Sequence, residues 1–219
     1  ENKVLEGKNP YLMVGFNRRF SALSKCIKQS LSTMEGATSI IYRVNAGKLP
    51  SDSWHDDPIL GAGRIIGECC HFIDLIKYFT GSTIDWVSGS HANNKSKAIY
   101  DIATINLGFS DGSISTIHYF SNGAPEMSKE YVEIFKNGKC LQLHNFKKIK
   151  NFGFNLNGSK WLFNQDKGFE KEAEEFVSNY TQKKNAPILF EELYEVSKAT
   201  ILAYSAITSG KTFYMNHKG

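Results

Sequence analysis

The residues most able to do chemistry lie in one apolar segment, residues 61–79. Glu68, His71 and Asp74 recur there at every third position, so a helix places them on one narrow stripe. Arg64 lies two turns before His71 on nearly the same face. An imidazole can take or give a proton near neutral pH, and a neighbouring carboxylate can fix its tautomer. The stripe therefore indicates His71 as a general acid/base, with Asp74 or Glu68 orienting it.

The same spacing is also compatible with a structural histidine. Apolar residues surround most of this helix, which predicts a buried element, and a buried imidazole often only hydrogen-bonds a carboxylate such as Asp74. Gly61, Gly63 and Gly67 form a GxGxxxG at the helix start. A dinucleotide-binding loop must follow a buried strand, however, and the residues before this helix are SWHDDPIL. We therefore expect no phosphate cradle here.

Further candidates for substrate binding are Arg18, Arg19, Trp54 and Arg64. The two adjacent arginines follow a short predicted strand at 12–16 and could donate to substrate hydroxyls or a phosphate. One of them is expected to serve in a salt bridge instead, and the sequence does not choose between them. Trp54 lies in a proline-containing loop before the key helix, where it either stacks on a sugar ring or plugs the core.

The elements around these residues predict an α+β fold. We expect a large, mostly antiparallel sheet with helices packed on one face, because helical patterns at both ends flank a run of period-two segments. Asp111-Gly112 and Asn137-Gly138 are typical hairpin turns. The expected strands are 38–46, 84–91, 102–109, 113–120, 130–136, 139–144 and 147–152, and the other expected helices are 21–36, 169–183 and 191–209.

Composition excludes several classes of function. The net charge of +4 is spread along the chain, so no nucleic-acid surface is expected. No apolar run approaches the roughly 20 residues of a membrane span, and the N-terminus lacks a signal peptide, which predicts a cytoplasmic protein. The histidines lack metal-ligand spacing, so no metal site is expected. We interpret all four cysteines as reduced apolar fillers.

The segment 61–74 resembles the GGGxLxDxGxHxxD pattern in the second domain of the glucose-fructose oxidoreductase / inositol dehydrogenase / rhizopine catabolism (Gfo/Idh/MocA) family. Two of the pattern's glycines fall on Gly61 and Gly63, its histidine on His71 and its last aspartate on Asp74. The segments VGFNRRFS and GRIIGECCHFID resemble the corresponding segments of family members that are fused to, or associated with, zinc-type alcohol dehydrogenases. The resemblance extends over nearly the whole chain.

Two positions depart from the family pattern. The first aspartate of the pattern falls on Gly67 and its later glycine on Cys69. Glu68 is adjacent to the missing carboxylate, but one residue along a helix turns a side chain by about 100°. Whether Glu68 replaces the family aspartate is open.

The resemblance implies that residues 1–219 form a single α+β domain for substrate binding and oligomerisation. Residues 1–10 would be the remnant of a linker from an N-terminal Rossmann domain that this sequence lacks. The full-length protein would be an NAD(P)-dependent oxidoreductase of a sugar, sugar nucleotide or related polyol, with NAD or NADP held by the missing domain. The fragment alone would bind no cofactor and be inactive. The alternative is a non-catalytic oligomerisation or scaffold domain of the same fold.

The predicted sheet also has consequences for assembly. Its helices can cover one face only, and the alternation in TIHYF and YVEIF predicts Tyr, Phe and Ile residues on the other. Members of the family often pair through this open face. We therefore expect a homodimer or tetramer formed sheet against sheet.

Overall fold

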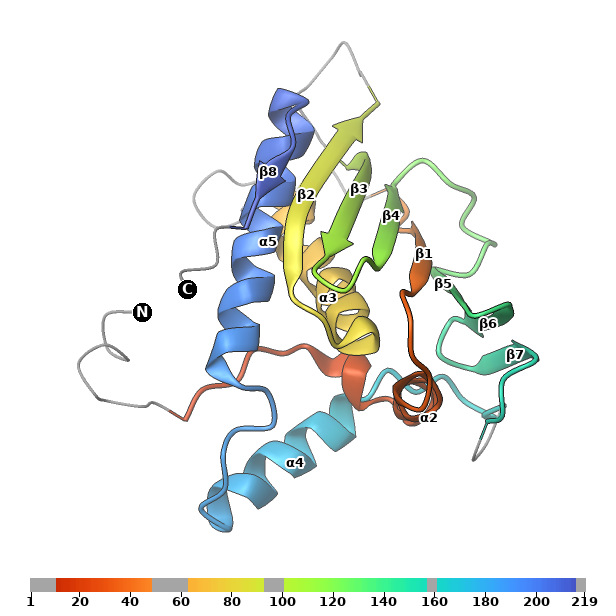
Figure 1. Cartoon of the computed structure of the whole chain (residues 1–219), viewed down its shortest axis with the longest axis vertical. Helices are drawn as coiled ribbons and strands as arrows, with labels where there is room; N and C mark the ends of the chain where they lie inside the picture. Colours follow the sequence, from red (N-terminus) through yellow and green to blue (C-terminus); the bar gives the residue numbers. More distant parts are fainter. Residues whose placement is uncertain (1–10, 49–62, 93–100, 157–160, 216–219) are drawn as a thin grey trace.

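The computed structural model describes residues 11–48, 63–92, 101–156 and 161–215 (Figure 1). A single 3₁₀ turn, four α-helices and eight β-strands make up these residues. Their bounds are η1 Asn17–Phe20, α2 Ala22–Ser32, β1 Ser39–Asn45, α3 Gly63–Thr80, β2 Ile84–His91, β3 Ile102–Phe109, β4 Ile114–Phe120, β5 Glu130–Lys136, β6 Lys139–His144, β7 Lys148–Phe152, α4 Phe169–Thr181, α5 Phe190–Ser209 and β8 Phe213–Tyr214.

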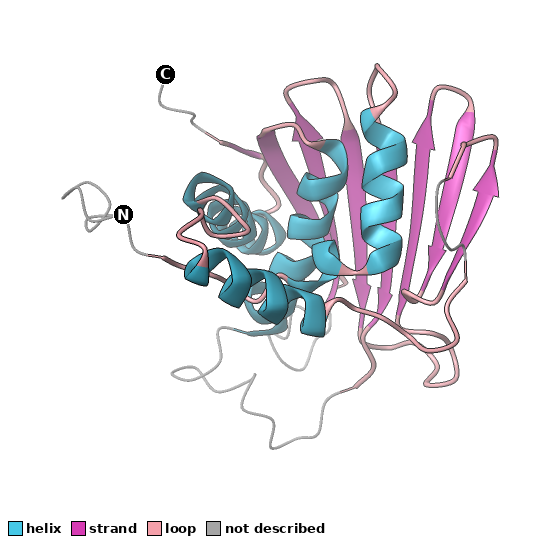
Figure 2. Cartoon of the chain, turned by 90° about the horizontal axis from the view of Figure 1, so that it is seen from below, coloured by secondary structure: helices cyan, strands magenta, loops and turns pink. Residues whose placement is uncertain are grey.

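The strands form one eight-stranded sheet in the order β7-β6-β5-β1-β4-β3-β2-β8. β1 runs parallel to β4 and every other neighbouring pair is antiparallel. The helices lie on one side of the sheet and leave its other face open (Figure 2). The expected α+β architecture, with a mostly antiparallel sheet and helices on one face, is therefore present.

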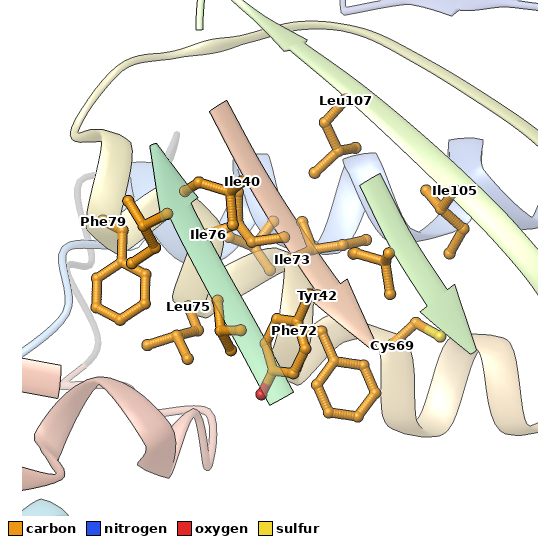
Figure 3. Close-up of a cluster of buried hydrophobic side chains, with 14 of the residues drawn as sticks. Ile40, Tyr42, Cys69, Phe72, Ile73, Leu75, Ile76, Phe79, Ile105 and Leu107 are labelled. Carbon is orange, nitrogen blue, oxygen red and sulfur yellow. The ribbon is translucent and has the colours of Figure 1, made fainter. Parts of the chain in front are cut away.

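The core lies between α3 and the central strands. Tyr42 from β1 packs on Phe72 from α3 with ring centroids 5.0 Å apart, and both side chains are buried. Ile73 and Cys69 of α3 are fully enclosed in the same cluster (Figure 3). Each such aromatic or aliphatic side chain contributes about 1.5–3 kcal/mol when it is fully buried. This packing fixes the rotation of α3 and so decides which way its polar stripe points.

The sequence predicted most element boundaries within two residues, but it missed the position of β1. This strand inserts between β5 and β4, where it joins what would otherwise be two separate antiparallel meanders. The expected strand at 12–16 is wrong, because the chain there has no sheet partner and turns tightly, the Phe16 amide donating to the Val14 carbonyl at 2.6 Å. The short edge strand β8 was also missed.

The orientation of α4 differs from the usual amphipathic arrangement. Its apolar residues Phe169, Val177 and Tyr180 are 59–66% exposed, whereas the buried residue of the helix is Glu172. The Tyr11 ring packs edge-on against Tyr180, with 5.2 Å between ring centroids, and partly covers this outer face. The helix thus packs on the site region through a polar side chain.

Gly168 allows α4 to approach η1. Its φ of +84° lies in the left-handed region, and a Cβ there would come within 2.4 Å of the Asn17 carbonyl oxygen and 2.5 Å of the Ser21 nitrogen. Beside it, the Asn17 side-chain amide donates to the Lys167 carbonyl at 2.8 Å. This contact holds the loop before α4 against η1, and it brings Lys167 to the site described below.

Candidate functional site

His71 lies on α3 with its ring partly exposed. Its Nδ1 is buried and has no hydrogen-bond partner among the described residues. The ring stands edge-on to Phe16, with centroids 6.0 Å apart. Burial, together with the nearby positive charge of Arg18, lowers the pKa of His71 to about 4. The imidazole is therefore neutral at pH 7 and has a free nitrogen.

On one side of His71 lies an ion pair between η1 and β5. Arg18 binds Glu130 through two bonds, Nε to Oε2 at 2.8 Å and Nη2 to Oε1 at 3.0 Å. Glu130 also accepts from the Tyr42 hydroxyl at 2.5 Å and from Lys167 Nζ at 2.6 Å. Burial would raise the pKa of this carboxyl, but Arg18 and Lys167 lower it to about 2. Glu130 is thus a permanently ionised anchor at the start of β5.

On the same helix as His71, Glu68 is held by two other cations. Arg64 Nε donates to Glu68 Oε1 at 2.8 Å, and Lys129 Nζ lies 3.3 Å from Oε2. Arg64 also donates to the carbonyls of Ala46 and Gly47, after β1. Burial opposes ionisation, but Arg64 and Lys129 lower the pKa of Glu68. This cluster ties the first turns of α3 to the end of β1.

Asp74 takes part in a third ion pair, directed toward α5. Arg19 donates to both carboxylate oxygens of Asp74, at 3.0 and 2.5 Å, and to Glu192 at 2.9 Å. Burial raises the pKa of Asp74 to about 6 against the opposing charge of Arg19, so the pair is ionised at neutral pH. Each of these buried arginines also lies over an aromatic ring, as Arg19 does over Tyr78 at 5.2 Å.

The polar stripe is therefore real, but its members do not bond to one another. Neither Asp74 nor Glu68 hydrogen-bonds His71, because each carboxylate is occupied by an arginine from another turn or element. The expectation that one of them orients the ring is not met in this structure. Arg18 and Arg19 both form salt bridges, where the sequence predicted one. Trp54 lies outside the described residues.

Four polar residues of the site were missed at the level of sequence, namely Glu130, Lys167, Lys129 and Tyr119. The sequence does contain a signal for Glu130. Residues of β5 alternate between the two faces of the sheet, and Glu130 falls on the side that faces the core, where a charged residue is unusual. Tyr119 is completely buried, and its hydroxyl interacts with the Glu68 carboxylate. Burial and the neighbouring Glu68 raise its pKa. No pattern in the sequence marks Lys167, which lies in an irregular loop.

Other chemistries have little support in the described part of the chain. All four cysteines are free, and burial raises the pKa of Cys70 to about 11, which disfavours a thiolate nucleophile. The described residues contain no group of three or more His, Cys, Asp or Glu side chains that could hold a metal. None of the described helices is long and apolar enough to cross a membrane.

A nicotinamide dinucleotide does not fit the described residues. Such a cofactor needs a βαβ unit whose helix N-terminus receives the pyrophosphate. The parallel pair β1 and β4 is joined here through α3, β2 and β3, and β1 enters no tight turn into a helix. The described residues around His71 therefore include a group that could accept a proton, but they form no βαβ unit of the kind that receives a dinucleotide.

Comparison with known structures finds the same fold in several dehydrogenases. A probable dehydrogenase from Thermotoga maritima superposes with a TM-score of 0.73 at 15% identity, covering 95% of this chain and 66% of that one. A myo-inositol dehydrogenase from Corynebacterium glutamicum gives 0.71 at 19%, covering 94% and 65%. A scyllo-inositol dehydrogenase from Lactobacillus casei, solved with NAD(H) and scyllo-inositol, gives 0.70 at 16%, covering 97% and 67%.

At these identities the superpositions show a shared fold, and the chain spans only 65–67% of the length of these three structures. No curated protein sequence matches the chain. The link to zinc-type alcohol dehydrogenases stays a prediction. Residues 36–138, from before β1 to the turn after β5, match the family model for the GFO/IDH/MocA C-terminal domain. Within residues 36–138, the chain is therefore similar to the C-terminal domain of the Gfo/Idh/MocA oxidoreductases.

Proposed function

We propose that this chain is the substrate-binding and catalytic part of an NAD(P)-dependent oxidoreductase that acts on a sugar, sugar nucleotide or related polyol. The observation that carries the proposal is the state of His71: a partly exposed, neutral imidazole with one unpaired nitrogen, set among ion pairs that are already satisfied. A buried structural histidine would hydrogen-bond a neighbour. This ring is neutral and so keeps its capacity to accept a proton.

The chemistry assigned to this chain is the movement of one proton. When an alcohol is oxidised, its C–H leaves as a hydride to the nicotinamide, and its O–H proton needs an acceptor. His71 accepts that proton and becomes an imidazolium. Glu68 and Glu130 are both ionised and close enough to affect its charge, so they stabilise this form without competing for the proton.

The cofactor belongs to another part of the full-length protein in this proposal. The solved relatives extend beyond the region that this chain matches, and one of them was solved with NAD(H) and scyllo-inositol. We place nicotinamide binding in a Rossmann domain that supplies this additional length. NAD and NADP are both compatible with the proposal, and a cytoplasmic location remains our expectation.

One feature of the structure favours the alternative, a non-catalytic domain of the same fold. Asp74 and Glu68 contact arginines rather than His71, so no carboxylate fixes the tautomer of the ring. In a purely structural module, these ion pairs would serve only to join η1, α3 and β5. The two readings differ in what happens when His71 loses its basicity.

The test compares turnover by the full-length wild-type protein with turnover by its His71→Asn variant. We expect turnover of a sugar or polyol to fall by roughly 10²- to 10⁴-fold with cofactor affinity unchanged, the usual effect of losing one general acid/base. His91→Asn is a matched control, because His91 is exposed at the end of β2. Near-normal turnover of the His71 variant would support the non-catalytic alternative.

We also propose that the protein assembles through the open face of the sheet. Ile41, Ile114 and Phe135 are 38–54% exposed on this face, and no helix covers it (Figure 2). This face is less apolar than we expected from the sequence, because the side chains of Tyr119 and Ile134 are buried on the helix-covered face. Light scattering at micromolar concentration should give a dimer or tetramer that Ile114→Lys dissociates. A wild-type monomer would contradict this.

A further inference from the structure

The charges around His71 do not balance. Glu130 is bound by Arg18 and Lys167, and Glu68 is bound by Arg64 and Lys129. Among the described residues, four cations thus share two carboxylates. With His71 neutral, these four cations and two carboxylates carry a net charge of +2, and the neighbouring group of Arg19, Asp74 and Glu192 carries −1, so the positive charge is in excess. We call His71 with these four cations and two carboxylates the cationic cluster.

We propose that the cationic cluster binds an anionic group of the substrate, a carboxylate or a phosphate, next to His71. The substrate class would then be an acidic or phosphorylated carbohydrate rather than a neutral polyol. This inference rests on the proposed function, because it takes His71 as the point where the substrate reacts. It goes further by naming the charge that the substrate must carry.

The arrangement of the cations supports an anion at the open side of the cluster. The two arginines are buried and locked, with side-chain exposures of 9% for Arg18 and 4% for Arg64. The two lysines are nearer solvent, at 16% for Lys167 and 40% for Lys129. An ammonium group has three donors, and a single carboxylate contact leaves donors available to a ligand. The lysines are therefore the residues that can reach an incoming anion.

One buried polar atom points to the same conclusion. Nδ1 of His71 is enclosed and unpaired within the described residues. A buried polar atom without a partner is costly, so such atoms often mark a place completed by a ligand.

An anion would also correct the basicity of His71. A general base works best with a pKa near the working pH, and burial with Arg18 holds the pKa of His71 at about 4. The charged groups that affect the ring are Arg18 from η1, Glu130 from β5, Glu68 from α3 and Lys129 from the segment before β5. A bound negative charge offsets Arg18 and Lys129, and so raises the pKa of His71 toward neutrality. Substrate binding would thus activate its own base.

The experiment measures binding and the pKa of His71 in this chain by NMR, without cofactor. The probes are D-glucuronate and inorganic phosphate, with D-glucose as the neutral counterpart of glucuronate. We expect one or both anions to shift the His71 imidazole resonances and raise its pKa, whereas glucose does not. Lys129→Gln and Lys167→Gln should each weaken anion binding by roughly three- to tenfold, as for a partly screened charge contact. Lys147→Gln is the control, because Lys147 is exposed outside the cluster.

The outcomes separate this inference from the proposed function. Binding of glucuronate but not phosphate assigns a sugar acid, and the reverse assigns a phosphate ester. Equal affinity for glucose and both anions, or equal losses in the Lys147 and Lys129 variants, overturns the inference. If the full-length enzyme oxidises neutral polyols as well as anionic sugars, the inference fails and the proposed function stands. If anions bind but His71→Asn leaves turnover unchanged, the catalytic role of His71 fails, and only the anion site remains.

Discussion

Replacing Glu130 by glutamine should be among the most damaging conservative changes in this domain. Arg18, Lys167 and Tyr42 all donate to this one carboxylate, whose side chain is fully buried. Glu130→Gln removes the charge at nearly constant shape and leaves the Arg18 guanidinium as a buried cation without its counter-charge. Breaking a buried ion pair in this way costs about 3–5 kcal/mol.

The pKa of Glu130 gives an independent magnitude. Its fall from 4.5 to about 2 on folding corresponds to roughly 3 kcal/mol of stability. Because the pKa is lowered in the folded state, this contribution is complete above pH 4.5 and is lost as the pH falls through 2. The difference between wild type and Glu130→Gln should therefore be constant near neutrality and shrink toward pH 2.

Urea unfolding of both proteins between pH 7 and pH 2.5 measures this difference. Glu174→Gln provides the control, since Glu174 pairs with Lys171 on the exposed side of α4 and should change stability by less than about 0.5 kcal/mol. A loss below about 1 kcal/mol for Glu130→Gln at pH 7 would mean that Glu130 does not stabilise the buried Arg18. A loss of the same size at pH 2.5 as at pH 7 would mean that the charge of Glu130 is not the cause.

Two further predictions concern α4. Glu172 is buried with Oε1 unpaired, and burial together with Asp74 raises its pKa to about 7. Because the pKa is raised in the folded state, the protein loses stability as the pH rises above 4.5. Glu172→Gln should therefore stabilise the protein by roughly 1–3 kcal/mol at pH 8 and have little effect at pH 4. Urea unfolding at the two pH values measures this difference. Gly168→Ala should destabilise by more than about 2 kcal/mol in thermal unfolding, because φ is positive and a Cβ meets backbone atoms of η1; an unchanged midpoint would contradict the packing described for α4.

The helices and strands were predictable because local rules determine them. Ser21 caps α2, Gly210 ends α5 in the left-handed conformation, and Asn137-Gly138 makes a turn with φ positive at both residues. The central place of β1 was not predictable in this way. A strand pairs with neighbours distant in sequence, and period-two alternation does not say which ones.

The site was predictable only in part, for a related reason. Spacing along α3 indicated a polar stripe, and the family resemblance singled out His71 and Asp74 within it. The partners of that stripe come from η1, the end of β1 and the start of β5, which only the folded chain brings together. Glu130 is an example. The alternation along β5 predicts that its side chain faces the core, but nothing in the sequence predicts that it pairs with Arg18.

An NMR pH titration of the His71 imidazole in the unliganded protein measures the state of this ring directly. We infer that the ring is a neutral base, unpaired at Nδ1 and held so by burial and by Arg18. We predict a titration midpoint at about 4, with the neutral ring present throughout the physiological range. A midpoint at or above the ordinary value of 6.5 would mean that a carboxylate stabilises the charged ring, and it would contradict the claim.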